Sequence, residues 1–289
     1  MGRFLWMVVL VLVLVACGGE REPEGGVILA GTPSPVQVVL VSGDFGVGRP
    51  RVSFVLYEGT APLRDVQGVV LTAVSLDDPE GEPVWSGTAE SYTDYVIPYW
   101  VVYPELPTPG YWGMTAEITL ANGEKTVSTF VVGALEETSS PAIGEMAPAS
   151  HNRTIHTEPD LSKLSSGANP DPAFYQMTVA EAIASGKPTV VGILTPGLCQ
   201  TSFCAPVLDS VKQVRDEVGE RVNFIHIEVY ADFETLAPVP EMAEWGLVTE
   251  PWVFVLDENG RVAAKFNGPV SPRELMAALQ PLLAAGGEG

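Results

Sequence analysis

The sequence predicts two domains: an all-β sandwich followed by an α/β domain whose central mixed sheet is flanked by helices. The chain has 289 residues, which is enough for two domains of ordinary size. Residues 34–133 contain short β-branched runs, often alternating and separated by turn signals. Residues 173–289 instead alternate helix-like and strand-like patterns. Residues 134–172, rich in Ser, Asn, Pro and Gly, are expected to link the two domains.

The N-terminus predicts export and a lipid anchor. An apolar run from Phe4 to Ala16 follows Arg3 and is too short for a comfortable transmembrane helix, as in a signal peptide. The run ends at Cys17 in Leu-Val-Ala-Cys, which resembles the lipobox of bacterial lipoproteins. That resemblance implies a signal peptide over residues 1–17, acylation of Cys17, and a protein held on the extracytoplasmic side of the cell membrane. A plain secretory signal with an incidental cysteine is the alternative.

Composition narrows the classes of function. Residues 18–33 are rich in Glu, Gly and Pro and are expected to form a flexible tether. The whole chain carries 36 acidic and 15 basic residues, a net charge of −21. Neither domain has a basic stripe, which argues against a nucleic-acid partner. The three histidines, His151, His156 and His226, form no helical metal-ligand spacing, so we expect no metal and no cofactor.

The predicted sandwich rests on strand-like runs in the first domain. Asn122-Gly123 lies between two alternating runs and predicts a hairpin. The stretch from Pro107 to Met114 resembles the Pro-Gly-x-Trp segment of immunoglobulin-like domains in bacterial exported proteins, and this implies an immunoglobulin-like sandwich. The expected strands span residues 36–41, 51–57, 68–74, 82–85, 111–120 and 125–132.

Seven aromatic residues gather between two of these runs. They predict either an aromatic surface for a partner or the core and rim of the sandwich, and the core is the simpler interpretation. The seven are Tyr92, Tyr95, Tyr99, Trp100, Tyr103, Tyr111 and Trp112.

The second domain follows the order α-β-α-β-α-β-β-α. Thr178 and Glu181 form a capping box, and Ser271 and Glu274 form a second one with Pro272 at the first helical position. The expected elements are a helix ending at Gly186, strand 188–194, helix 206–218, strand 221–229, a helical turn at 240–245, strands 252–256 and 261–266, and a helix from 271 to about 285.

Cys199 and Cys204 lie between the first strand and the second helix of this domain. The strand fixes one end of the segment, and the helix N-terminus favours a thiolate. If Cys17 is acylated, these two are the remaining cysteines of an exported chain, which favours a disulfide between them.

This arrangement resembles the thioredoxin fold over about residues 173–286. The dithiol position, the segment from Gly246 to Val255 with its cis-proline at Pro251, and the closing hairpin and helix carry the resemblance. It implies a thiol–disulfide oxidoreductase in which Cys199 attacks, Cys204 resolves the mixed disulfide and Pro251 aligns a substrate strand. The implied partners are exported protein thiols and disulfides, or a redox partner protein.

The segment departs from that family in several ways. Cys204 lies five residues after Cys199, so a disulfide requires Cys199 in the loop and Cys204 at the helix start. Leu198 stands where thioredoxins have Trp, and the strand Val190–Leu194 lacks their buried acid. Glu250 precedes the cis-proline, and its charge is expected to raise the pKa of nearby thiols.

Two other functions fit the same residues. A copper metallochaperone of the Sco type also carries two close cysteines on a thioredoxin-like fold, with a histidine late in the domain; here no histidine follows His226. A binding or scaffold lipoprotein would use the disulfide only as a structural staple. A peroxidase is a further alternative, because Thr201 lies three residues before Cys204 as in the peroxiredoxins, but the proline that should precede the threonine in that resemblance is out of place at Pro196.

Overall fold

The computed structural model describes residues 34–199 and 201–285, and from Ser34 onward the chain forms one compact unit. The predicted signal peptide, Cys17 and the tether lie outside the described residues. Within the described ranges, no helix is long and apolar enough to cross a membrane.

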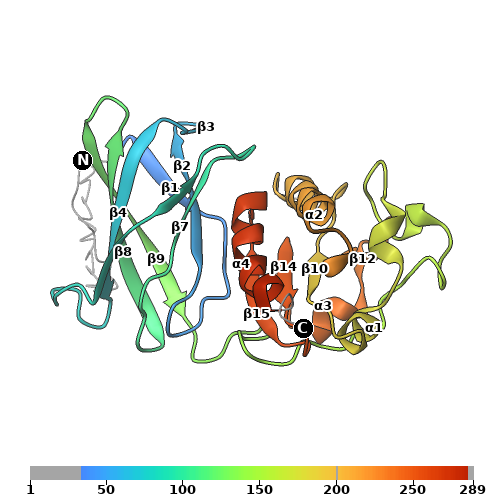
Figure 1. Cartoon of the computed structure of the whole chain (residues 1–289). Helices are drawn as coiled ribbons and strands as arrows, with labels where there is room; N and C mark the ends of the chain where they lie inside the picture. The colour runs from blue at the N-terminus through green and yellow to red at the C-terminus, as the bar shows by residue number, and fades with distance from the viewer. Residues whose placement is uncertain (1–33, 200, 286–289) are drawn as a thin grey trace, which may run out of the picture. The chain divides into compact units, whose positions relative to one another are not determined.

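The first part of the chain is a pair of antiparallel sheets (Figure 1). One sheet has the order β1-β2-β7-β6 with β3 on β2, and the other has the order β5-β4-β8-β9. Their strands are β1 (Val36–Leu40), β2 (Val52–Glu58), β3 (Ala61–Pro62), β4 (Val66–Ser75), β5 (Trp85–Thr88), β6 (Glu90–Tyr92), β7 (Tyr99–Val102), β8 (Gly110–Leu120) and β9 (Lys125–Ala134).

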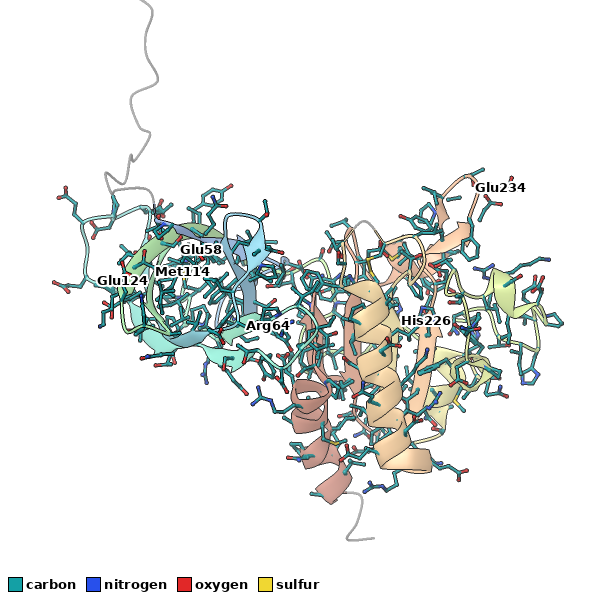
Figure 2. The ribbon with its side chains drawn as sticks, turned by 90° about the horizontal axis from the view of Figure 1, so that it is seen from above. Glu58, Arg64, Met114, Glu124, His226 and Glu234 are labelled. Atoms are coloured by element: carbon teal, nitrogen blue, oxygen red, sulfur yellow. A yellow bond between two sulfur atoms is a disulfide. The ribbon has the colours of Figure 1, made fainter. Side chains whose placement is uncertain are left out.

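Alternation along the strands builds the core between these sheets. On β8, Trp112, Met114 and Ile118 are buried, and they share one apolar cluster with Phe54 of β2. Figure 2 shows Met114 inside the sandwich. All six expected runs contain strands. The sequence missed β3, β6 and β7, which are two to four residues long and too short to show a period.

The second part is a four-stranded mixed sheet with helices. Its order is β11-β10-β14-β15; β10 is parallel to β11 and antiparallel to β14. The elements are α1 (Val179–Ala184), β10 (Thr189–Ile193), α2 (Cys204–Val218), β11 (Asn223–Ile227), β12 (Tyr230–Asp232), β13 (Ala237–Pro238), α3 (Pro240–Glu244), β14 (Trp252–Leu256), β15 (Val262–Asn267) and α4 (Pro272–Ala285).

Helices cover both faces of this sheet. Val190 of β10 and Val253 of β14 belong to one apolar cluster with residues of α2 and α4. Val191 and Phe254, the next residues on the same strands, belong to a second cluster with residues of α1 and α3. Adjacent strand residues point to opposite faces, so continuous apolar runs are needed where both faces are covered.

The segment expected to be a linker, residues 134–172, packs against the protein. Ser140, Ser150 and Asn152 are buried in it, and Asn152 Oδ1 accepts a hydrogen bond from Val179 N at the start of α1. The segment includes a short 3₁₀ helix, η1 (Leu161–Lys163), and a second, η2 (Pro172–Tyr175), follows it. Buried polar groups with partners hold such irregular chain in place.

A buried ion pair joins the sandwich to α4. Arg51 precedes β2, and its five N–H groups are all used: two on Glu274 at 2.7 and 2.9 Å, and three on Ser53 Oγ, Asn267 O and Pro269 O. Tyr99 Oη donates to Glu274 Oε2 at 2.7 Å. The charge of Glu274 raises the pKa of Arg51 even though burial opposes it.

The seven aromatic residues that gather in the sequence occupy three places: the sandwich core, the contact between the sandwich and the α/β part, and the surface. Trp100 and Trp112 lie in the sandwich core. Tyr92, Tyr95 and Tyr99 form a separate cluster with Phe203, the residue before α2. Tyr103 and Tyr111 are exposed. Three of the seven aromatics therefore pack against the α/β part, an arrangement that neither sequence interpretation described.

Candidate active site

Cys199 and Cys204 form a disulfide where β10 gives way to α2, with their Cα atoms 6.1 Å apart. Cys199 lies in the loop and is partly exposed, whereas Cys204 is the first residue of α2 and is completely buried. This is the placement that the five-residue spacing required. Cys204 lies in the first turn of α2, where free backbone N–H groups favour a negative charge on its sulfur once the disulfide is reduced.

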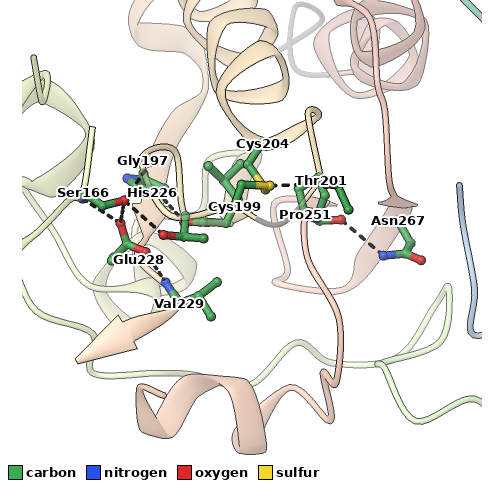
Figure 3. The surroundings of a disulfide bond; sticks show 12 residues. Ser166, Gly197, Cys199, Thr201, Cys204, His226, Glu228, Val229, Pro251 and Asn267 are labelled. Carbon is green, nitrogen blue, oxygen red and sulfur yellow. Dashed lines mark hydrogen bonds between the residues drawn. A yellow bond between two sulfur atoms is a disulfide. The ribbon is translucent and has the colours of Figure 1, made fainter. Parts of the chain in front are cut away.

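Hydroxyl groups fix the loop that carries Cys199 (Figure 3). Thr201 Oγ1 lies 3.3 Å from Cys199 Sγ and must be the donor, since a disulfide sulfur has no proton. Ser166 Oγ accepts from Gly197 N at 2.9 Å and lies 3.0 Å from Thr195 Oγ1. These bonds tie the loop to the segment between η1 and η2, so residues outside the β-loop-α unit hold the loop that carries Cys199.

The peptide bond between Glu250 and Pro251 is cis, and Pro251 is buried. Pro251 O accepts hydrogen bonds from Asn267 Nδ2 at 3.2 Å and from Gly268 N at 3.0 Å. These donors hold the turn that brings Glu250 to the disulfide.

Glu250 is the acidic group of the site. A carboxylate oxygen of Glu250 and the two sulfur atoms lie within 4.8 Å of one another. Its Oε2 is buried and has no hydrogen-bond partner within the described ranges. Burial raises the pKa of Glu250 to about 7, the charge of Glu228 adds to this rise, and the backbone of Thr195 opposes it. The carboxyl group therefore titrates near neutral pH.

Glu228 lies beside this site but has its partners in place. It is 3% exposed, and its carboxylate accepts from Ser166 N and Oγ, both at 2.8 Å, and from Val229 N at 2.9 Å. Sequence reasoning missed Glu228 and Ser166 as parts of the site. The sequence does contain one signal for it: Glu228 lies near the end of the mostly apolar run from Val222 to Val229, where a charged side chain is expected to be buried.

His226 is buried with both ring nitrogens engaged. Nε2 lies 2.9 Å from Leu194 O and must donate, since a carbonyl oxygen only accepts; Nδ1 of the neutral ring then accepts from Tyr175 Oη at 2.6 Å. Burial lowers the pKa of His226, which favours this neutral form. The late histidine of the copper alternative thus offers no free nitrogen.

Metal binding has little support in the oxidised site. Within the part of the chain that the structure describes, Cys199, Cys204 and Glu250 are the single group of three close metal-ligand side chains. The disulfide uses both sulfur atoms, so one carboxylate remains. His151 and His156 are both exposed and do not belong to this group.

Comparisons with known proteins gave distant matches among solved structures and none among families or curated sequences. No protein family matches the chain, and no curated protein sequence matches it. Among solved structures, a DsbF homologue from Corynebacterium diphtheriae is 20% identical, with a TM-score of 0.31, over 37% of this chain and 77% of that one. A thiol:disulfide interchange protein from Chlorobium tepidum is 18% identical, with a TM-score of 0.31, over 38% and 89%. CopC from Methylosinus trichosporium is 13% identical, with a TM-score of 0.24, over 34% and 92%. Each of these matches is distant and covers less than half of this chain.

Proposed function

We propose that the chain is an exported, lipid-anchored thiol–disulfide oxidoreductase whose redox centre is the Cys199–Cys204 pair. The unequal exposure of the two sulfurs carries this proposal. Cys199 is partly exposed in a loop, while Cys204 is completely buried at a helix N-terminus. A staple has no need for such inequality, whereas exchange needs one sulfur that partners reach and one that they do not.

The proposed cycle uses this difference. In the reduced protein the Cys199 thiolate attacks a substrate disulfide, and a mixed disulfide forms as one substrate thiolate leaves. Cys204 then attacks Cys199 Sγ and releases the second substrate thiolate. The substrate gains the two electrons that the protein dithiol loses, and the reverse sequence oxidises a substrate dithiol. In this proposal Pro251, which follows the cis peptide bond, aligns a substrate strand.

A trapping experiment tests this function. The probe is a peptide dimer joined by a disulfide. We expect reduced Cys204→Ser to accumulate a mixed disulfide between Cys199 and one peptide, because the resolving sulfur is missing. Cys199→Ser should form none, since its remaining thiol is buried. Mass spectrometry of non-reduced, alkylated protein measures both adducts.

Ser202→Ala is the matched control, because Ser202 is an exposed residue of the same loop. With a small-molecule thiol as the reductant that regenerates the protein dithiol, it should reduce the peptide disulfide as fast as the parent does. The enzyme proposal is wrong if the parent shows no turnover, or if both cysteine variants turn over the peptide as fast as the parent.

The lipid anchor rests on the sequence around Cys17, and it is tested separately. Cells fed an alkyne-tagged fatty acid should label the full chain, and the protein should sediment with membranes. Cys17→Ser should lose the label and the sedimentation, because the acylated sulfur is gone. Cys204→Ser serves as the control that keeps both. A labelled Cys17→Ser protein would contradict the assignment.

A further inference from the structure

Resolution of the mixed disulfide poses a proton problem in this site. Cys204 is completely buried, and burial in apolar surroundings opposes ionisation of a thiol. A buried thiol must lose its proton before it attacks, and the same atom must regain one when the cycle runs in reverse. Strand β10, beneath the pair, contains no acid to do this.

The titratable groups around the pair leave one candidate. Glu228, after β11, already accepts three hydrogen bonds, and His226 on β11 has both ring nitrogens engaged. Tyr230, on β12, has a pKa raised by burial and by the charges of Glu250 and Glu228, so it is no base at neutral pH. Glu250 remains.

Glu250 has the geometry of a proton carrier. A carboxylate oxygen lies within 4.8 Å of both sulfur atoms, a gap that one water molecule or a small side-chain rotation closes. Among the described residues its buried Oε2 has no hydrogen-bond partner, so this oxygen can accept a proton without losing a bond within that part of the chain. No lysine or arginine of the described residues contributes to its pKa, which burial and Glu228 bring to about 7.

We infer that Glu250 is the general base and general acid for Cys204, an inference that rests on the proposed oxidoreductase function. After Cys199 attacks the substrate disulfide, the first substrate thiolate takes a proton from water. The Glu250 carboxylate then accepts the proton of the Cys204 thiol. The Cys204–Cys199 bond forms, the bond from Cys199 to the substrate sulfur breaks, and the leaving thiolate takes the proton from Glu250. Two electrons and two protons have reached the substrate.

The alternative is that Glu250 hinders the resolving step by electrostatic repulsion instead of assisting it by proton transfer. A permanently ionised carboxylate near the sulfurs would only repel the Cys204 thiolate, and its removal would speed the resolving step. A carboxyl group that titrates in the working pH range instead exchanges a proton with the thiol, and its removal slows that step. The sign of the effect of Glu250→Gln therefore separates the two roles.

Single-turnover kinetics test the inference. The reduced full chain is mixed with oxidised glutathione by rapid mixing and acid-quenched over pH 5 to 10, and the lifetime of the Cys199–glutathione adduct is measured by mass spectrometry. In the parent, we expect the resolving rate to rise with pH and level off near 7. Glu250→Gln should resolve the adduct about 100-fold more slowly at pH 7, and its rate should keep rising past about 8.5, where a free thiol ionises. Formation of the adduct should change little.

Two further variants keep the test decisive. Glu250→Asp retains a carboxyl group and should keep the inflection near neutral pH at an intermediate rate. Glu234→Gln removes an exposed acid on the loop between β12 and β13 and should match the parent. An equal or faster resolving rate in Glu250→Gln, with an unchanged pH profile, overturns the inference but leaves the oxidoreductase proposal standing. Failure of the reduced parent to reduce oxidised glutathione overturns the oxidoreductase proposal itself.

Discussion

Glu274 and Glu250 are both acidic residues with buried oxygens, yet their surroundings are opposite. Glu274 is 5% exposed; each of its oxygens accepts from Arg51, and one also accepts from Tyr99. Glu250 has a buried oxygen for which the described residues offer no hydrogen-bond partner, and it has a second acid nearby. A buried carboxylate with full pairing belongs to the architecture, whereas a half-buried one with an unpaired oxygen beside a disulfide is a candidate for chemistry.

The largest expected effect on stability comes from breaking the ion pair between Arg51 and Glu274. Arg51→Met should lower the free energy of unfolding by about 3–5 kcal/mol, because it leaves Glu274 buried and without its cation. Chemical denaturation of the oxidised protein, followed by tryptophan fluorescence, measures this loss.

Arg49→Met is the matched control, since Arg49 is exposed two residues earlier and has no ion pair in the described part of the chain. It should change stability by less than about 0.5 kcal/mol. Replacing Glu274 by Met as well should recover part of the loss, because no buried charge then remains. A loss below about 1 kcal/mol in Arg51→Met would mean that the pair is solvated and that the comparison with Glu250 is unsound.

Periodicity and turn chemistry predicted most of the local structure. The capping box at Thr178 and Glu181 forms as expected, because capping depends on residues three apart in the sequence. The five-residue step between Cys199 and Cys204 fixed which cysteine begins the helix, since a disulfide limits the Cα separation. These are short-range constraints, and a single sequence contains them.

Long-range pairing could not be predicted in the same way. Nothing in the alternating run around Arg51 shows that its side chain reaches Glu274, more than two hundred residues later. Phe203 lies between the two cysteines in the sequence, and its packing against Tyr95 and Tyr99 depends on how two separate sheets meet. Glu250 was placed near the thiols by its position before Pro251, but its unpaired oxygen is visible only once the surrounding side chains are in place.

Removing the charge of Glu250 is expected to have a smaller effect on stability, and one that stabilises the protein. Glu250→Gln should stabilise the oxidised protein by about 1 kcal/mol at pH 8, a value reduced for solvent screening because the group is only half-buried. The folded state raises the pKa of Glu250 from 4.5 to about 7, so it binds the proton more tightly than the unfolded chain does. The parent therefore loses stability as pH rises through that window, and the isosteric neutral variant does not.

Denaturant midpoints of parent and Glu250→Gln at pH 4, 6 and 8 measure this difference. The two stabilities should converge at pH 4, where the carboxyl group is protonated in both states, and should separate progressively up to pH 8. Glu234→Gln, which alters an exposed acid, should give a pH-independent difference near zero. If Glu250→Gln is instead less stable than the parent at pH 8, Glu250 has a stabilising partner in its ionised form, and it belongs with Glu274 as part of the architecture rather than the chemistry.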